Sequence, residues 1–202
     1  MRRGWLVTVT GLLGAAGVAG AATALLPDPA GPASEPAAPW RVAGLPKQDK
    51  PLTRYRVVDV DGGRAVEIDA QASYGNLVHE WPSGITARQL SWRWRIERDN
   101  PLTDLRRKAG DDHVVAVCAL FDLPLASIPF WERQLLRLAR TLSGEPLPAA
   151  TLCYTWDLRQ PTGSVLDSPY TRRVRWIVLR GDGEPLGTWR REQRDLRADF
   201  LR

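Results

Sequence analysis

Residues 90–96 alternate strictly between apolar and polar side chains, and their apolar positions include Trp92 and Trp94. Successive side chains of a β-strand point to opposite faces, so this alternation predicts a strand with one buried face. Two indoles on that face bury a large apolar area, and we expect the strand to anchor a core. Residues 113–121 are apolar at nearly every position, which is typical of a central strand covered on both sides. The two runs together predict a β-sandwich.

Further β-rich runs recur at short spacing along the chain. The predicted strands are residues 54–60, 64–70, 76–81, 151–158, 172–180 and 186–194. Glycine-containing turns at 61–63 and 181–183 separate two pairs of these runs, and each pair predicts a hairpin. The pattern predicts a mainly β protein, an antiparallel sandwich with one inserted helix.

The inserted helix is predicted at residues 130–142, where the periodicity of apolar side chains changes. One helical face carries Trp131, Leu135, Leu138 and Leu142, whereas Arg133, Arg137 and Arg140 point elsewhere. A basic amphipathic helix can lie on a membrane. Helices of soluble proteins show the same apolar stripe, and we expect this one to pack over an edge or end of the sandwich.

The first 39 residues differ in composition from the rest. Residues 1–26 combine early arginines with a long uncharged apolar run, which predicts a secretory signal peptide or an uncleaved N-terminal anchor. Residues 27–39 are rich in proline and alanine and predict an extended linker. The folded domain is expected over residues 40–202. The protein is therefore predicted to be exported, either periplasmic or secreted, or held at the inner membrane by its N-terminal segment alone.

The net charge of +5 comes mainly from arginines that are interspersed with acidic residues. No basic run or motif of a nucleic-acid-binding protein occurs, so nucleic acid is not an expected partner. The chain has nine tryptophans. Tryptophan-rich β-domains pack indoles in a core or display them for stacking on sugars, and composition does not separate the two.

Cys118 and Cys153 both lie inside apolar, strand-like runs and fit no zinc or redox motif. In an oxidising compartment they could pair if their strands face each other. We expect two buried free thiols, because strand geometry rarely brings two Cα atoms within the limit of about 7 Å.

Six short motifs occur together in a fixed order. They are residues 90–95, 108–112, 117–122, 152–156, 168–170 and 187–192. In this order they resemble the bacterial domain-of-unknown-function family 3047 (DUF3047), from residue 40 to the end of the chain. The resemblance implies an exported protein with a jelly-roll-like β-sandwich, and it carries over no activity and no catalytic residues. The family pattern continues past Asp199 and Phe200, so it also implies that this chain lacks a terminal strand and exposes a sheet edge.

The candidate ligand-binding residues are Arg93, Arg95, Lys108, Asp112, Trp156 and Tyr170. The two arginines share a strand face, and with the lysine and aspartate they would form a polar groove for an anionic or sugar ligand, walled by an aromatic ring. The ordinary alternative is a solvated ladder of arginine–carboxylate pairs worth under about 1 kcal/mol each. We favour that alternative.

No catalytic, metal or cofactor site is predicted. Asp111 and Asp112 supply too few of the six to eight oxygen ligands that calcium takes. Glycoside hydrolysis needs two facing carboxylates, and nothing in the spacing selects a pair among Glu67, Asp69, Glu80, Glu97, Asp112 and Asp157. The leading hypothesis is a non-catalytic protein that binds a carbohydrate or another cell-envelope ligand. The alternatives are a hydrolase of envelope polysaccharide and an interaction protein that docks through its helix.

Overall fold

The structure, a computed structural model, describes residues 4–8, 26–45, 48–81, 87–143 and 147–202. These residues divide into two compact units. Unit 1 comprises Met1–Arg98 and Leu186–Arg202, and unit 2 is Asp99–Pro185. The chain is mainly β, as predicted, but it forms several small sheets in two units where a single sandwich domain was expected.

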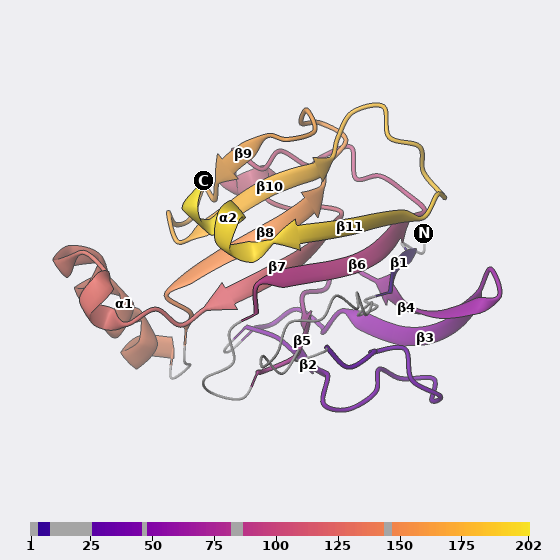
Figure 1. The fold of residues 1–202 in the computed structure, drawn as a ribbon, viewed down its shortest axis with the longest axis horizontal. Coiled ribbons are helices and arrows are strands. Elements are labelled where there is room, and N and C mark those ends of the chain that lie inside the picture. Colours follow the sequence, from indigo (N-terminus) through magenta and orange to yellow (C-terminus); the bar gives the residue numbers. More distant parts are fainter. Residues whose placement is uncertain (1–3, 9–25, 46–47, 82–86, 144–146) are drawn as a thin grey trace, which may run out of the picture. The chain divides into compact units, whose positions relative to one another are not determined.

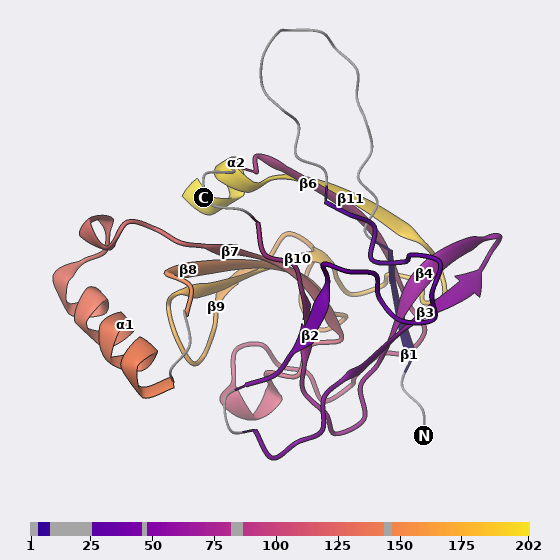
Figure 2. The same cartoon turned by 90° about the horizontal axis from the view of Figure 1, so that it is seen from below.

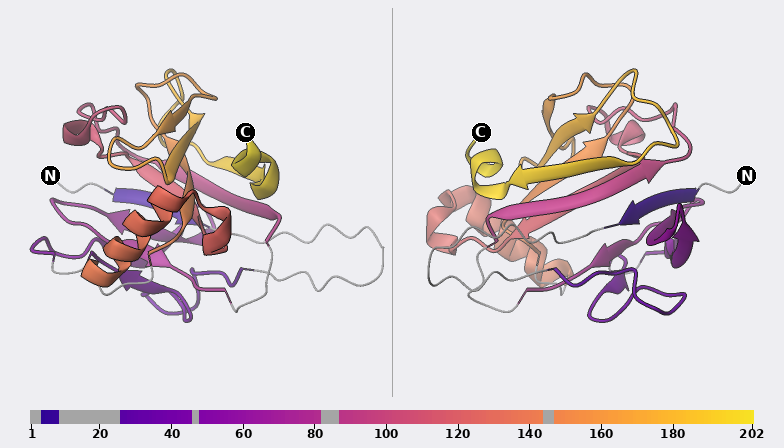
Figure 3. Two further views of the ribbon diagram at one scale, coloured as in Figure 1. Left: turned by 90° about the vertical axis from the view of Figure 1, so that its left-hand side faces the viewer. Right: turned by 45° about the vertical axis from the view of Figure 1, so that its right-hand side comes forward.

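Unit 1 contains a five-stranded sheet in the order β11-β6-β1-β4-β3 (Figure 1). The strands in chain order are β1 (Gly4–Thr8), β3 (Arg54–Val60), β4 (Gly63–Asp69), β6 (Gln89–Ile96) and β11 (Arg190–Asp195). Every neighbouring pair is antiparallel. Figure 3 shows β11 beside β6, although about a hundred residues separate them in the sequence.

Strand β6 has the predicted alternation. Trp92 and Trp94 are 1% and 0% exposed, and their rings meet edge to face with centroids 5.5 Å apart. Ile96 continues the same buried row. The prediction that β6 anchors a core through two inward-facing indoles is confirmed.

Strands β3 and β4 form the predicted hairpin. Val60 pairs with Gly63, so the loop between the strands is only Asp61 and Gly62. Both loop residues have positive φ, at 49° and 74°, as a type I′ turn requires and as an Asp-Gly sequence favours. The turn places the Asp61 side chain at one end of the sheet.

Strand β1 comes from the predicted leader and pairs with β4 on one side and β6 on the other. The rest of the leader, residues 1–3 and 9–25, lies outside the described residues.

The proline- and alanine-rich residues 27–39, where an extended linker was predicted, pack against strands β3 and β4 within unit 1. Ala30 is buried in a cluster with Val57 and Val66. The backbone N–H of Val57 donates to the carbonyl oxygen of Ser34 at 2.7 Å. Small side chains let this backbone approach the sheet closely, so the segment is held without a large apolar side chain of its own.

A two-stranded sheet joins β2 (Arg41–Ala43) to β5 (Asn76–Val78). Strand β5 is the first half of the predicted strand 76–81, and β2 was not predicted. Both strands have only three residues, too few for a periodic pattern to be recognised.

Unit 2 contains a four-stranded sheet in the order β7-β8-β10-β9 (Figure 2). Its strands are β7 (Val115–Phe121), β8 (Ala150–Trp156), β9 (Val165–Asp167) and β10 (Val174–Arg180). Strands β8 and β10 are parallel, whereas the other two pairings are antiparallel. This small mixed sheet does not confirm the predicted jelly-roll arrangement.

The prediction that residues 113–121 form a central strand covered on both sides is wrong. Strand β7 is an edge strand and belongs to a different sheet from β6. Cys118 and Leu120 on β7 are exposed. The strands buried on both faces are β8 and β10. An apolar run marks burial but does not identify the neighbouring strand.

Cys118 and Cys153 form a disulfide, so the expectation of two free thiols is also wrong. The antiparallel register of β7 and β8 sets the two residues directly opposite each other, with Cα atoms 4.1 Å apart. A disulfide required the two strands to face each other, and the sequence alone did not establish that they do.

The turn at residues 181–183 does not make the predicted hairpin, because β10 and β11 belong to different sheets. A Cβ atom on Gly181 would lie 2.3 Å from the carbonyl oxygen of Gln160. The turn is thus pressed against a neighbouring loop. Beyond it, the N–H of Gly187 donates to the carbonyl oxygen of Ile96 at 2.8 Å, which directs the chain onto β6.

Helix α1 (Phe130–Ser143) is present as predicted, but it packs through a different face. Leu136 is 2% exposed and clusters with Ile128 and Ala149, whereas Trp131 is 78% exposed. The predicted apolar stripe therefore does not hold the helix to the sheet. Figures 1 and 2 show α1 beyond the end of β7.

Three short helical segments complete the structure: η1 (Lys108–Gly110), η2 (Leu125–Ser127) and α2 (Leu196–Leu201). Asp195 caps α2 by accepting a hydrogen bond from the N–H of Ala198 at 2.9 Å. Within the described parts of the chain, the helices are all too short or too polar to cross a membrane.

Candidate functional site

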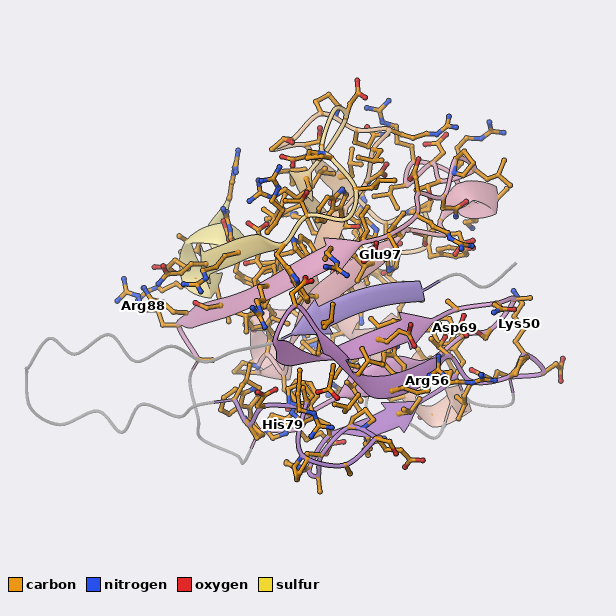
Figure 4. The ribbon with its side chains drawn as sticks, turned by 90° about the vertical axis from the view of Figure 1, so that its right-hand side faces the viewer. Lys50, Arg56, Asp69, His79, Arg88 and Glu97 are labelled. Carbon is orange, nitrogen blue, oxygen red and sulfur yellow. A yellow bond between two sulfur atoms is a disulfide. The ribbon has the colours of Figure 1, made fainter. Side chains whose placement is uncertain are left out.

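The outward face of β6 carries two arginines. Arg93 and Arg95 alternate with the buried tryptophans, so their guanidinium groups lie on the opposite face of the sheet. Figure 4 shows Glu97 at the end of this strand and Arg88 at its beginning. Arg95 donates a hydrogen bond to Glu97 at this end of the strand.

Trp189 joins this group from the segment that leads into β11. Arg190 pairs with Trp94 in the antiparallel register, which brings Trp189 opposite Arg95. The ring centroid of Trp189 lies 4.7 Å from the guanidinium carbon of Arg93 and 5.3 Å from that of Arg95. Such contacts are worth about 0.5–1 kcal/mol each at exposed sites, so the arginines hold the orientation of the ring.

Two carboxylates border the ring. Oδ2 of Asp61 accepts hydrogen bonds from Nε1 of Trp189 at 2.9 Å and from Nη1 of Arg95 at 2.5 Å. Oε1 of Glu97 accepts one from Nε of Arg95 at 2.6 Å. Asp61, Arg93, Arg95, Glu97 and Trp189 together are called the Trp189 surface below.

The two arginines of this surface differ in how their charge is balanced. Arg95 is only 15% exposed and pairs with both Asp61 and Glu97. Within the described parts of the chain, Arg93 has no ion pair, and its buried Nε has no hydrogen-bond partner. Arg93 therefore keeps a positive charge that an anionic group could balance.

The arrangement suits a ligand that is apolar on one face and polar at its edge. The partly exposed indole of Trp189 offers a flat apolar area. The guanidinium groups donate hydrogen bonds, and the carboxylates of Asp61 and Glu97 accept them. A sugar ring presents C–H bonds on its face and hydroxyl groups around its rim, which matches this distribution.

Lys108 and Tyr170 come together in unit 2. The ammonium nitrogen of Lys108 lies 5.4 Å from the Tyr170 ring centroid, and the tyrosine hydroxyl donates to the Lys108 carbonyl oxygen at 3.0 Å. Tyr170 is 61% exposed. These two predicted residues thus share a surface, and they belong to a different unit from Arg93 and Arg95.

Asp112 holds its own loop together. Its carbonyl oxygen accepts hydrogen bonds from Nδ2 of Asn100 at 2.8 Å and from Oγ1 of Thr103 at 2.6 Å. Its Oδ2 accepts a further one from Asn100 at 3.2 Å. These bonds correspond to the structural role that acidic residues often have in turns.

Trp156 does not line a surface. Its side chain is 0% exposed, within the fully buried end of β8. The prediction that it walls a ligand groove is contradicted by this burial, because β8 is covered on both faces.

Three ionisable groups of unit 2 are shifted by burial. Burial lowers the pKa of His113 to about 4, and nearby Asp112 opposes the shift. Burial raises the pKa of Asp111, and the charge of Asp112 adds to the effect. Burial also raises the pKa of Asp157, whose Oδ2 has no hydrogen-bond partner. In the described ranges, no three His, Cys, Asp or Glu side chains gather as a metal site would require.

The carboxylates considered for hydrolysis are mostly engaged elsewhere. Glu67 pairs with Arg56 at 2.6 Å, Glu80 with Arg41, and Glu97 with Arg95. Asp69 accepts a hydrogen bond from Gln71 at 3.0 Å. These contacts occupy Glu67, Glu80, Glu97 and Asp69 with partners from the chain itself.

A small hollow opens beside Asp69, which Figure 4 labels. Its volume is about 150 Å³, and it is lined by Pro51, Leu52, Arg54, Asp69, Gln71 and Ser73. Pockets for small-molecule ligands are usually about 300–1,000 Å³. The hollow is too small to enclose a sugar, which leaves the open Trp189 surface as the stronger candidate.

Sequence reasoning missed Trp189 and Asp61 as members of the site. Asp61 was assigned only to a turn, and Trp189 only to a motif and to the predicted strand 186–194. The register between β11 and β6 was needed to bring them to Arg93 and Arg95. The one usable signal was the position of a motif tryptophan inside the predicted strand 186–194.

Neither a curated protein nor a solved structure matches this chain significantly. A family described as Protein of unknown function (DUF3047) matches residues 38–202, which is most of the chain. This match agrees with the resemblance carried by the six motifs. The chain therefore belongs to the DUF3047 family.

Proposed function

We propose that the protein is an exported component of the bacterial cell envelope that binds a carbohydrate on its Trp189 surface, without catalysis. The observation that carries the proposal is the Trp189 ring, held by Arg93 and Arg95 and hydrogen-bonded to Asp61. An aromatic ring fixed among charged donors and acceptors can stack on a sugar and bind its hydroxyl groups without large rearrangement.

The Cys118–Cys153 disulfide supports export. Disulfides persist in the periplasm and outside the cell and are rare in the reducing cytosol. The basic and apolar composition of residues 1–26 agrees with this compartment. The envelope is also where polysaccharides are abundant, which links the proposed location to the proposed ligand.

The absence of catalysis is proposed because the candidate carboxylates have other partners. Glu67, Glu80 and Glu97 each form an ion pair with an arginine. A general acid for glycoside hydrolysis needs a raised pKa. Burial raises the pKa of Asp157, but this residue is 1% exposed, which separates it from a polymeric substrate.

The test is binding of the purified protein to a panel of envelope and extracellular glycans, by array and then by calorimetry. Trp189→Ala should weaken binding to any glycan found by about tenfold, because losing an aromatic contact costs about 1.5 kcal/mol. Arg93→Ala should weaken binding most for glycans that carry carboxylate or phosphate groups. The melting temperature should change little, since these side chains are only partly buried.

Trp131→Ala is the matched control, because Trp131 is also an exposed tryptophan but belongs to unit 2 and not to the Trp189 surface. It should leave glycan binding unchanged. Tyr170→Ala tests whether the Lys108–Tyr170 surface takes part in glycan binding, which is measured by the same array and calorimetry. Equal binding by wild type and Trp189→Ala would refute the site, and release of new reducing ends from a bound glycan would refute the absence of catalysis.

A further inference from the structure

Helix α1 leaves its apolar stripe open to solvent. Trp131, Leu135 and Leu138 are 78%, 64% and 55% exposed. Spacings of four and three residues place them on one side of the helix. Phe130 at the helix start is 55% exposed and packs edge-on against Trp131, with centroids 5.4 Å apart. Contiguous apolar area of this kind marks an interaction surface.

The stripe is not needed to hold the helix in place. Leu136, on another side, is 2% exposed and packs with Ile128 and Ala149. Nε of Arg140 donates to the carbonyl oxygen of Leu147 at 2.8 Å, and Arg173 donates to the carbonyl oxygen of Glu132. The helix is therefore fixed on unit 2 while its apolar stripe stays available.

The charge of the helix indicates what covers the stripe. The helix carries three arginines and one acidic residue, Glu132. Arg140 pairs with Asp122 at 3.3 Å, so Arg133 and Arg137 against Glu132 leave an excess of one positive charge (two minus one). The whole chain is also basic, at +5. A surface that is apolar within and negatively charged at its boundary complements such a helix, and a bilayer with anionic headgroups has both properties.

We infer that α1 lies flat on an anionic membrane, with Trp131, Leu135 and Leu138 immersed at the boundary between headgroups and acyl chains. The helix has 14 residues and is about 21 Å long, so it lies in the interface and does not span it. Tryptophan is enriched at this depth because its ring is apolar and its N–H is polar. The inference is independent of the proposed glycan site.

The test reads the environment of single positions on α1 in the full chain, because residues 1–26 can bind lipid by themselves. Both native cysteines form a disulfide, so a cysteine introduced by Leu135→Cys can be labelled selectively with the polarity-sensitive dye NBD. Arg137→Cys is the matched control, since Arg137 is also exposed but lies away from the stripe.

On vesicles containing phosphatidylglycerol, NBD at position 135 should shift to the blue, gain intensity and be quenched by spin-labelled lipid. NBD at position 137 should shift much less. Vesicles of phosphatidylcholine alone, or high salt, should reduce the shift at 135. Leu138→Cys should repeat the result of Leu135→Cys.

Three outcomes would overturn the inference. The first is an equal response at 135 and 137, and the second is no response at 135 on anionic vesicles. The third is a blue shift at 135 without lipid that grows with protein concentration, which would show that a second copy of the chain covers the stripe.

Discussion

At the scale of single residues, the buried hydrogen bond between Trp94 and Glu192 joins distant parts of unit 1. Nε1 of Trp94 donates to Oε1 of Glu192 at 3.0 Å, and Glu192 is 8% exposed. A buried indole N–H left without an acceptor costs about 1–3 kcal/mol. The sequence places Trp94 in a core, but it contains no local signal that its polar atom finds a carboxylate 98 positions later.

His113 makes stability depend on pH. Its ring packs on Trp176 with centroids 4.7 Å apart, and burial lowers its pKa to about 4. An unfolded histidine has a pKa of about 6.5 and takes up a proton first. Stability should therefore fall as pH decreases from about 6.5 to about 4, by at most about 3 kcal/mol.

Urea unfolding between pH 7 and pH 4 measures this loss, with His113→Gln as the comparison. The wild type should lose more stability over this interval than the variant. Asp111 and Asp157 act in the opposite direction, because their raised pKa values favour the folded state as they become protonated. They are present in both proteins, so parallel pH curves would show that His113 does not titrate as expected.

At the scale of elements, the disulfide fixes an exposed edge strand. Cys118 on β7 is exposed, whereas Cys153 on β8 is 3% exposed and packs with Leu105 and Trp176. The bond closes a loop with a sequence separation of 35 residues, which includes α1. It therefore ties the edge strand β7 to β8, a strand of the core.

Replacing both cysteines by serine should lower the free energy of unfolding by about 4 kcal/mol, as the chain-entropy estimate for such a loop gives. Chemical denaturation of the double variant measures the loss. Reduction of the wild type with dithiothreitol should reproduce it, and a double variant as stable as the oxidised wild type would contradict the expectation.

Element types could largely be predicted from the sequence, because alternation and helical periodicity are local. The hairpin of β3 and β4, the strand β6 and the extent of α1 are examples. Pairing could not be predicted, because an apolar run such as residues 115–121 fits a central strand and an edge strand equally well. The same limit explains why the face of α1 was assigned wrongly, since the stripe shows what is apolar but not what lies against it.

At the scale of the whole molecule, export should give the protein two measurable properties. Protein recovered from the periplasm or membrane fraction should have a mass lower by the two hydrogens lost from Cys118 and Cys153. It should also resist thiol labelling until it is reduced, because only the disulfide protects the exposed Cys118. Intact mass spectrometry measures the mass difference of two hydrogens, and the same spectrum shows whether the residues of β1 are retained.

The comparison is protein expressed without access to the export machinery, which should carry reactive thiols. Recovery of the native protein mainly from the cytosol, with both thiols free, would contradict the proposed location.

Only part of the candidate site could be predicted from the sequence. Its arginines could be identified from the alternation of β6, because the face of a strand is a local property. Trp189 and Asp61 could not, because they reach the arginines through strand order and register. Trp156 was misjudged because burial on both faces depends on neighbours from elsewhere in the chain.

Unit 1 is built from the beginning and the end of the chain, and this has a consequence for synthesis. When β6 has just been translated, about a hundred codons still separate it from its partner β11. Throughout that interval the nascent chain carries a strand with an unpaired edge and two indoles, which invites association with other chains. A holding chaperone, or passage through a translocase while unfolded, would protect this edge until the last residues arrive.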